Sequence, residues 1–433
     1  MESGPAVTSA PHLTSPTLAP LRALEHTCIT RHADIEAWLH RQFLQTPASF
    51  YSSVDIRNAG WKMAPVDTNL FPAGFNNLAP ALTPLIRNAL QTAIQRICPQ
   101  AATVLLIPEN HTRNRFYLDN IARLFDLLTS GGFEVRLGSV DPDAPAVQEL
   151  TSANGQQLTI HATQRVGGRV MVDGFDPCVV LLNNDLSSGL PAVLENLEQP
   201  LLPPSALGWN KRLKSDHFGI YAQVAQGFGD MLDIDPWLVD PLWRNCGQVD
   251  FMKREGEECL IHNVDALLGA TAAKYAEHGI DDSPYVVIKA DAGTYGMGIM
   301  IARSVDDVRE LNRKQRKSMA ATKGRSVSQV ILQEGVPTAE RVNGAIAEPV
   351  FYCVEHNVIG GFYRVHTERG RDENLNAPGA HFEPFAIADS CSCPDAERDC
   401  DAQPNRLYAA GVIARLAALA AAREIARVNG EAA

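Results

Sequence analysis

The sequence predicts an α/β fold in which an N-terminal domain built on a parallel sheet is followed by an α+β region. Two stretches carry this prediction. Residues 102–107 form a β-branched, apolar run, an amphipathic helix follows at 116–130, and a second strand begins at 133. This strand-helix-strand order is typical of parallel sheets. Residues 286–288 and 299–302 are two further apolar runs, and they flank a turn with three glycines, which predicts a β-hairpin.

Size and composition limit the classes of protein that fit. A chain of 433 residues has room for two or three domains, and 45% hydrophobic with 20% charged residues is an ordinary globular balance. No apolar run is long enough to cross a bilayer, so we expect no membrane partner. A net charge of −12 argues against a nucleic-acid partner. Residues 1–20 lack the basic start and apolar core of a signal peptide, and we expect a disordered tail.

Nine cysteines are scattered along the chain, most of them in apolar segments. An odd, dispersed set is typical of reduced thiols, which predicts a cytoplasmic location. Cys391, Cys393 and Cys400 cluster within ten residues. They could bind a metal together with His381, but their spacing matches no common zinc site. A loop of reduced thiols is the alternative.

The first half of the chain supplies candidate substrate contacts. A helix is expected over 21–45 because apolar residues recur at helical spacing. Residues 54–77 show little periodicity, and we interpret them as a long binding loop, with a structural Ω-loop as the alternative. The candidates in this segment are its polar side chains: Asp55, Arg57, Lys62, Asn69, Asn76 and Asn77.

A second group of candidates follows the strand at 102–107. Arg113 and Arg115 come where that strand ends, and ligands of α/β folds bind at this edge of the sheet. Arginine grips a carboxylate or phosphate through two parallel hydrogen bonds, so both are candidate substrate ligands. Surface charge at the start of a helix is the alternative. A Pro-Pro pair at 203–204 suggests a domain boundary, which divides the chain into an α/β substrate-binding domain at 21–203 and a catalytic region at 204–433.

The second half carries features expected of a phosphate site. Lys289 ends the first strand of the hairpin, and the turn behind it contains Gly293, Thr294, Tyr295, Gly296 and Gly298. Glycines allow the backbone N–H groups to approach a phosphate closely. Lys211 and Lys214 are expected on one face of a helix that opens at 208. An ordinary glycine-rich hairpin and a solvated basic helix face are the alternatives.

Further polar residues follow in the last third of the chain. A strand at 327–336 ends in Gln333 and Glu334, and two adjacent strands are expected at 348–355 and 358–364. The segment behind them contains Glu373, Asn374 and Asn376. Carboxylate and amide oxygens are the ligands that Mg²⁺ prefers, so this segment is a candidate metal site, with a polar turn as the alternative. An alanine-rich helix is expected over 405–428.

Six motifs together resemble the bacterial glutamate-cysteine ligases of the compact, glutathione-synthetase-like type, whose C-terminal half is ATP-grasp-like. They are VDIRNAGWK (54–62), NLFPAGFNN (69–77), IKADAGTYGMGI (288–299), QEGV (333–336), GGFYR (360–364) and ENLNAPG (373–379). The resemblance implies a homologous fold from about residue 20 to 428. It also implies ATP- and Mg²⁺-dependent joining of L-glutamate to L-cysteine through a γ-glutamyl phosphate, the first step of glutathione synthesis.

The resemblance further implies residue roles. Lys289 and Arg364 neutralise charge during phosphoryl transfer, and Lys211 or Lys214 reaches the α-phosphate. Gln333 and Glu334 lie where ATP-grasp enzymes bind adenine and ribose. The Asp strand and Glu-x-Asn pair of glutathione synthetases have no clear counterpart here, so the candidate metal ligands are Glu348, Glu355, Glu373 and Asn376. Another peptide ligase such as glutathione synthetase, or a nucleotide-binding regulatory module without turnover, is the alternative. A homo-oligomer is possible.

Overall fold

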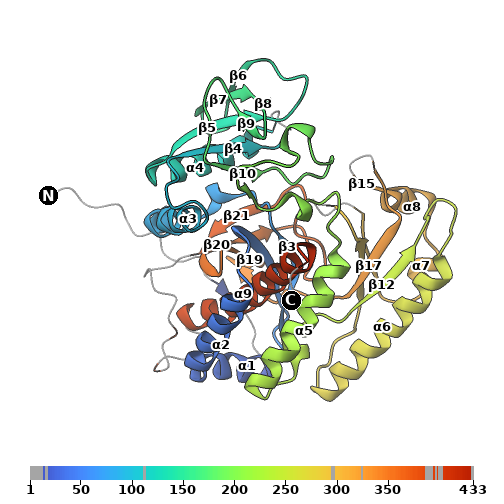
Figure 1. Ribbon diagram of the computed structural model, residues 1–433. Coiled ribbons are helices and arrows are strands. Elements are labelled where there is room, and N and C mark those ends of the chain that lie inside the picture. Colours follow the sequence, from blue (N-terminus) through green and yellow to red (C-terminus); the bar gives the residue numbers. More distant parts are fainter. Residues whose placement is uncertain are drawn as a thin grey trace.

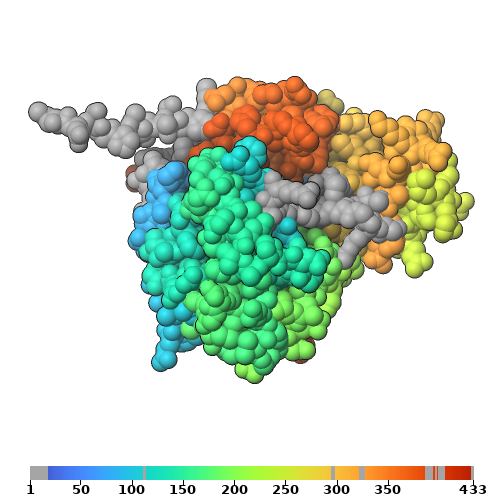
Figure 2. Space-filling view, turned by 90° about the horizontal axis from the view of Figure 1, so that it is seen from above, coloured from blue at the N-terminus to red at the C-terminus, as the bar shows by residue number. Residues whose placement is uncertain are grey.

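The computed structural model describes residues 13–14, 18–110, 114–293, 298–322, 325–385, 394, 397 and 403–430. Three sheets organise these residues (Figure 1). The first is six-stranded, the second is seven-stranded and central, and the third is four-stranded. Figure 2 shows the three regions meeting: cyan to green for the first, orange for the C-terminal strands of the second, and yellow to light orange for the third.

The six-stranded sheet confirms the parallel α/β prediction. Its order is β11 (Leu201–Leu202), β10 (Val179–Asn183), β4 (Thr103–Pro108), β5 (Glu134–Ser139), β7 (Gln157–Ala162) and β6 (Val147–Thr151). All neighbouring pairs are parallel except β6 with β7. Helices α3 (Thr83–Ile97) and α4 (Arg115–Ser130) share one apolar core with residues of this sheet. This packing explains the amphipathic pattern of both helices.

The seven-stranded sheet is antiparallel and corrects the interpretation of residues 54–77. Instead of a long loop, this segment contains most of β2 (Tyr51–Asn58) and all of β3 (Met63–Asn69), which form a hairpin. β2 pairs with β19 (Ala345–Val354), which pairs on its other edge with β20 (Asn357–His366). β21 (His381–Pro384), β18 (Arg341–Val342) and β1 (Leu13–Thr14) complete the sheet. Nearly every residue of β2 is buried, so the alternation that marks a half-exposed strand is missing.

Helices cover one face of the central sheet. α1 (Ala19–Thr30), α5 (Lys214–Leu232) and α9 (Gln403–Val428) share one core cluster with inward-facing residues of β2, β3 and β19. α9 matches the expected C-terminal helix, and it crosses in front of the sheet in Figure 1. The single helix expected over 21–45 is two helices, α1 and α2 (His32–Gln45), which meet at Arg31.

The four-stranded sheet has the order β12 (Trp243–Gln248), β17 (Gln329–Glu334), β13 (Val286–Ala290) and β14 (Ile299–Ala302), and it is antiparallel throughout. The expected hairpin is therefore present as β13 and β14. α6 (Glu257–Glu277) packs against one face of this sheet. Two short helices follow β14: α7 (Asp306–Arg309) and α8 (Arg313–Ala320).

The remaining elements are short. They are β8 (Gln164–Val166), β9 (Arg169–Met171), β15 (Ala321–Thr322), β16 (Arg325–Ser326) and five 3-10 turns: η1 (Phe75–Asn77), η2 (Pro80–Leu82), η3 (Ala192–Leu194), η4 (Ser205–Leu207) and η5 (Pro236–Leu238). The domain division at residue 203 stays a prediction, although strands from both sides of it share the central sheet. Within the described ranges, no helix has the length and apolar character needed to cross a membrane.

Candidate functional site

A cavity of about 130 Å³ lies where the central sheet, the four-stranded sheet and the start of α5 meet. Charged side chains from both sheets line it, although the strands that carry them are far apart in the sequence. The lining residues on which the argument below depends are Asp55, Arg57, Val66, Asp67, Lys214, Lys289, Gly293, Gln333, Glu348, Arg364, Asp372, Asn374 and Asn376.

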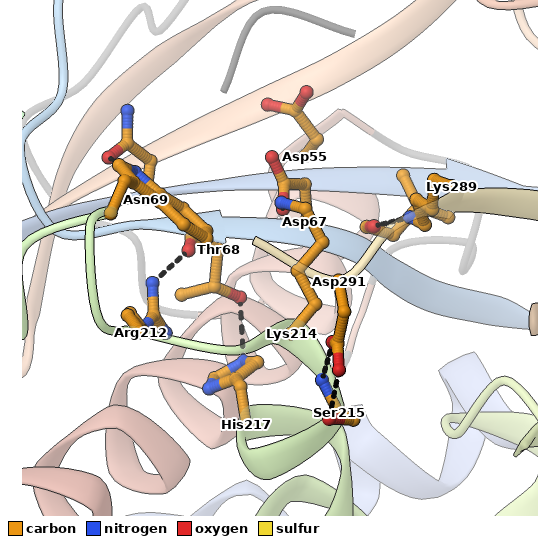
Figure 3. A network of polar contacts seen from close by, with 12 residues as sticks. Asp55, Asp67, Thr68, Asn69, Arg212, Lys214, Ser215, His217, Lys289 and Asp291 are labelled. Atoms are coloured by element: carbon orange, nitrogen blue, oxygen red, sulfur yellow. Dashed lines mark hydrogen bonds and ion pairs between the residues drawn. The ribbon is translucent and has the colours of Figure 1, made fainter. Parts of the chain in front are cut away.

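Two lysines share one side of the cavity (Figure 3). Lys289 projects from β13, and its Nζ donates a hydrogen bond of 2.7 Å to the carbonyl oxygen of Val66 on β3. Lys214, the first residue of α5, places its Nζ 2.6 Å from Oδ1 of Asp67. Trp209 lies beneath it, with its ring centroid 4.1 Å from the Lys214 Nζ. Strand β3 therefore positions both lysines.

Burial and neighbouring charges perturb this group. Burial lowers the pKa of Lys289 to about 8, and the attraction of Asp67 only partly offsets it. Burial alone would raise the pKa of Asp67, but Lys214 and Lys289 lower it to about 2. At neutral pH Lys289 thus keeps its charge and Asp67 is ionised. Strongly perturbed pKa values in a cleft are typical of functional sites.

Two arginines and two carboxylates form the opposite side. Glu348 on β19 accepts from Arg57 Nε at 2.8 Å and from Arg364 at 2.5 Å. Arg364 also donates to Asp55 at 2.9 Å. Burial would raise the pKa of Glu348, but the two arginines hold it below its ordinary value. Within the described ranges, the buried Nε of Arg364 has no hydrogen-bond partner, so this guanidinium keeps a donor for a ligand.

Asp55 and Asp67 stand directly opposite each other on β2 and β3. Figure 3 shows their side chains close together. Like charges at opposed positions of a sheet repel each other. Burial raises the pKa of Asp55, and Glu348 and Asp67 raise it further, while Arg364 lowers it. Two carboxylates that face one cavity offer the oxygen ligands that a divalent cation binds.

Gln333 and Glu334 have different environments. Gln333 is 2% exposed and lines the cavity, and its Nε2 has no partner in the part of the chain that the structure describes. Glu334 also lines the cavity, but other protein groups occupy its carboxylate, and its expected ribose role stays a prediction. The carboxylate accepts from Lys62 Nζ at 3.0 Å, from the Trp237 indole at 3.0 Å and from the backbone N–H of Leu242 at 3.0 Å. Lys62 is likewise fully buried, and its ammonium group binds Glu334 and does not line the cavity.

Several predicted substrate ligands lie outside the cavity lining. Asn69 accepts from the backbone of Phe71 at 2.9 Å, and Asn76 and Asn77 lie in η1. Arg115 donates to the carbonyl of Ser152 at 3.0 Å. These contacts organise turns and helix ends. Arg113 lies outside the described residues, as do Thr294, Tyr295, Gly296, Cys391, Cys393 and Cys400.

Lys211 is exposed and precedes α5, so it does not share a helical face with Lys214 as expected. The helix begins only at Lys214, where the backbone N–H groups of Lys214 and Ser215 both donate to Asp291. Gly293 and Gly298 have φ values of 110° and 67°, which glycine adopts without strain. This conformation is consistent with the tight hairpin that the sequence predicts.

The candidate metal ligands do not all lie at the cavity. Glu348 and Asn376 line the cavity, and Asn374 lies there too. The Glu373 carboxylate instead accepts from the backbone N–H of Gly370 and from Arg369, each at 2.7 Å. Glu355 lies at the β19–β20 turn, pairs with Arg96 at 3.2 Å and lines a different hollow.

The sequence analysis did not select Asp67 or Asp372, although both line the cavity. The signal for Asp67 was present. Asp55 and Asp67 flank an Asn-Ala-Gly-Trp turn, and a hairpin through that turn places them opposite each other. Interpreting the segment as a loop concealed this pairing.

Comparisons with known proteins agree with one another. The family model described as glutamate-cysteine ligase matches residues 25–425. A crystal structure from Methylobacillus flagellatus KT, assigned as a gamma-glutamylcysteine synthetase, is 52% identical with a TM-score of 0.90, covering 97% of this chain and 100% of that one. D-alanyl-alanine synthetase A from Vibrio cholerae O1 is 11% identical, covers 69% of this chain and 78% of its own, and has a TM-score of 0.32, too low to support an argument.

A comparison with curated proteins finds no match. The family model nevertheless spans most of the chain, and the Methylobacillus structure matches the three-sheet fold over nearly its whole length. On both grounds the chain is an ATP-dependent ligase, and it belongs to the glutamate-cysteine ligase family.

Proposed function

We propose that the cavity joins the γ-carboxylate of L-glutamate to the amine of L-cysteine at the expense of ATP, through a γ-glutamyl phosphate. One observation carries the assignment of this site. The hairpin lysine Lys289 and the arginine pair Arg57 and Arg364 come from different sheets, yet they line one cavity. The phosphoryl donor and the carboxylate acceptor can therefore bind in one site, each in contact with its own cationic side chains.

ATP is assigned to the side formed by the four-stranded sheet. Lys289 and Lys214 face the phosphates, and Gly293 at the hairpin lets the backbone approach them. The unpaired amide nitrogen of Gln333 donates to an acceptor on the base. Strand β17 carries this amide in a fixed, buried position, which limits the entropy lost on binding.

The site fits a divalent cation, and we assign Mg²⁺ to it. The opposed carboxylates of Asp55 and Asp67 supply oxygen ligands, and a cation between them would relieve their repulsion. Asn376 and Glu348 remain candidate ligands at the same cavity. Bound Mg²⁺ neutralises phosphate charge and polarises the transferring phosphoryl group.

The chain's own groups act by charge and position. Arg364 and Arg57 hold the glutamate carboxylate, with Glu348 fixing both guanidinium groups. Lys289 stabilises the negative charge on the phosphoryl oxygens as the carboxylate attacks the γ-phosphorus of ATP, the bond from that phosphorus to the β–γ bridging oxygen breaks, and ADP leaves. The cysteine amine then attacks the acyl phosphate carbon, the C–N bond forms, and phosphate leaves with the electrons of the C–O bond. The amine proton passes to solvent or to phosphate.

The test is ADP release by the purified full-length protein with Mg²⁺ and ATP. Four mixtures are compared: no amino acid, glutamate alone, cysteine alone, and both together, with the product identified by mass. Release that requires both amino acids, with γ-glutamylcysteine formed, supports the proposal. Stimulation only by γ-glutamylcysteine with glycine would identify a glutathione synthetase instead. ATP binding without release in any mixture would indicate a regulatory module.

The metal assignment has an independent readout. Mn²⁺ replaces Mg²⁺ in many oxygen sites, and its electron paramagnetic resonance signal falls when it binds. Asp67→Asn should weaken Mn²⁺ binding in the presence of ATP by at least about tenfold. Glu355→Gln is the matched control, because Glu355 lies at another hollow. Equal binding by wild type and Asp67→Asn would remove Asp67 from the metal site. A cytoplasmic location and a homo-oligomeric state remain predictions.

A further inference from the structure

Two cysteines far from the ligase cavity contact each other. Cys246 on β12 donates a hydrogen bond to the sulfur of Cys259 in the first turn of α6, with 3.2 Å between the two Sγ atoms. A disulfide bond measures about 2.05 Å, so the two sulfurs need to approach by only about 1.2 Å. A movement of this size lies within the reach of side-chain torsions, so the backbone of β12 and α6 can stay in place.

We propose that Cys246 and Cys259 are an oxidisable pair that forms an intramolecular disulfide by exchange with small disulfides. The pair lies on the α6 side of the four-stranded sheet. Cys246 packs there with Val286 and Ile288 of β13, whereas Val287 and Lys289 of the same strand line the cavity. The sheet therefore separates this modification site from the ligase site, and nothing in the proposed mechanism uses either thiol.

The two thiols differ in access, which sets the order of the steps. Cys259 is exposed, and the amide nitrogen of Asn263 lies 3.4 Å from its sulfur. Cys246 is 1% exposed. Burial and, to a smaller extent, the neighbouring Cys259 raise the pKa of the Cys246 thiol to about 12. A reagent in solution therefore meets Cys259 first.

The chemistry balances in two exchange steps. Deprotonated Cys259 attacks a small disulfide, RSSR, to form a mixed disulfide, and one RS⁻ leaves. The Cys246 sulfur then attacks the Cys259 sulfur, its proton is released, and the second RS⁻ leaves. Two protein thiols are oxidised, RSSR is reduced, and the two released protons yield two RSH. Because the contact holds both sulfurs together, the second step has a high effective concentration.

The choice of small disulfide as the oxidant rests on the proposed function, whereas the pairing of Cys246 with Cys259 does not. Cysteine and γ-glutamylcysteine are thiols, and each has a disulfide as its oxidised form. Such disulfides accumulate when the thiol pool is oxidised, so the pair would register the oxidation state of the compounds that the enzyme consumes and makes. The two sites remain separately testable, because a cross-link is measured by mass without ligase turnover.

The experiment treats the reduced full-length protein with cystine, blocks remaining thiols with N-ethylmaleimide and digests it with trypsin. Cleavage after Arg244, Lys253, Arg254 and Lys274 places the two cysteines in separate peptides, 245–253 and 255–274. We expect these peptides to be joined, with the mass of the pair lowered by two hydrogens. The yield should exceed that of any other cysteine pair by at least about tenfold.

Two variants test the order of the steps. Cys246→Ala should leave Cys259 as a mixed disulfide with one added cysteine, and Cys259→Ser should leave Cys246 free for alkylation after denaturation. Cys98→Ser is the matched control and should cross-link as wild type does. If wild-type peptides 245–253 and 255–274 both carry N-ethylmaleimide while other cysteines have reacted with cystine, the proposal is overturned. A wild-type cross-link from Cys259 to a different cysteine overturns it as well.

Discussion

Replacing Lys289 by Met should weaken ATP binding and at the same time stabilise the empty protein. The Lys289 side chain is 9% exposed, and burial lowers its pKa from an ordinary 10.5 to about 8. At about 1.4 kcal/mol for each tenfold change, holding this charge in the cavity costs on the order of 3 kcal/mol of folding free energy below pH 8. Met is similar in length and carries no charge, so the variant avoids this cost.

The sign of the pH dependence follows from the same pKa. Between about pH 8 and 10.5, the native lysine has lost its proton while the unfolded one still binds it, so wild-type stability rises with pH relative to Lys289→Met. We expect the variant's melting temperature to exceed that of wild type by a few degrees at pH 7, and the gap to narrow at pH 9.5. Differential scanning fluorimetry of the ligand-free proteins measures both.

The binding measurement separates function from folding. A charge-assisted contact contributes about 1.5–3 kcal/mol, so the dissociation constant for ATP should rise about 10- to 150-fold in calorimetric titrations. Lys211→Met is the matched control, because Lys211 is exposed and does not line the cavity. A Lys289→Met protein that melts several degrees lower at pH 7 would refute the reasoning about burial. An unchanged ATP affinity would remove Lys289 from the site.

Three further predictions concern other parts of the molecule. Gln333→Leu should raise the ATP dissociation constant about 5- to 20-fold in titration calorimetry without lowering the melting temperature. The reason is that the native amide nitrogen is buried without a partner among the described residues. A lower melting temperature of the variant would show that the amide is paired. Asp67→Asn should raise the Mg²⁺ concentration for half-maximal ADP release by at least about tenfold, whereas Glu355→Gln leaves it unchanged; equal titrations of the two variants would contradict the metal assignment. Glu424→Gln should lower the melting temperature at pH 7. Glu424 pairs with Arg212 at 2.7 Å and with His217 at 2.7 Å in the interior, and breaking a buried pair costs about 3–5 kcal/mol. Burial alone would raise the pKa of Glu424, but Arg212 and His217 lower it to about 2, so this stabilisation is present above the ordinary carboxyl pKa and is lost as the pH falls towards 2. A gap between wild type and Glu424→Gln that stays constant from pH 7 to pH 3 would contradict that assignment.

Short-range patterns of apolar residues predicted some of the elements. The strand at 102–107 and the helix at 116–130 appear as β4 and α4, because an apolar run and an amphipathic face are visible in a short window. The strands β2 and β3 show no such pattern, because charged and polar residues interrupt their apolar runs. Most residues of β2 are nevertheless buried, and its charged residues are paired with groups elsewhere in the chain. Lys62 and Glu334, for example, are 272 positions apart.

The candidate site was predicted in part for the same physical reason. Lys289 and Gln333 end strands of the four-stranded sheet, and both line the cavity as their local motifs suggested. Lys62 was assigned to a substrate as a polar side chain of a presumed loop, and Glu334 was assigned to ATP by the resemblance to ATP-grasp enzymes. The structure shows that each is the other's partner. Sequence patterns identify charges that are unusual, but only the fold shows whether protein groups already neutralise them.

The charge balance of the cavity favours binding of a cation together with ATP. Four cationic side chains line it, from Arg57, Lys214, Lys289 and Arg364, and five carboxylates oppose them, from Asp55, Asp67, Glu334, Glu348 and Asp372. Lys214 is held by Asp67, and Arg364 by Asp55 and Glu348, so little net positive charge faces an incoming polyphosphate. Asp55 and Asp67 would hold a divalent ion, whose charge would offset these carboxylates and leave Lys214 and Arg364 available to the substrates. The acids therefore keep Lys214 and Arg364 in place, and the same acids would form part of the substrate-binding surface when a metal binds.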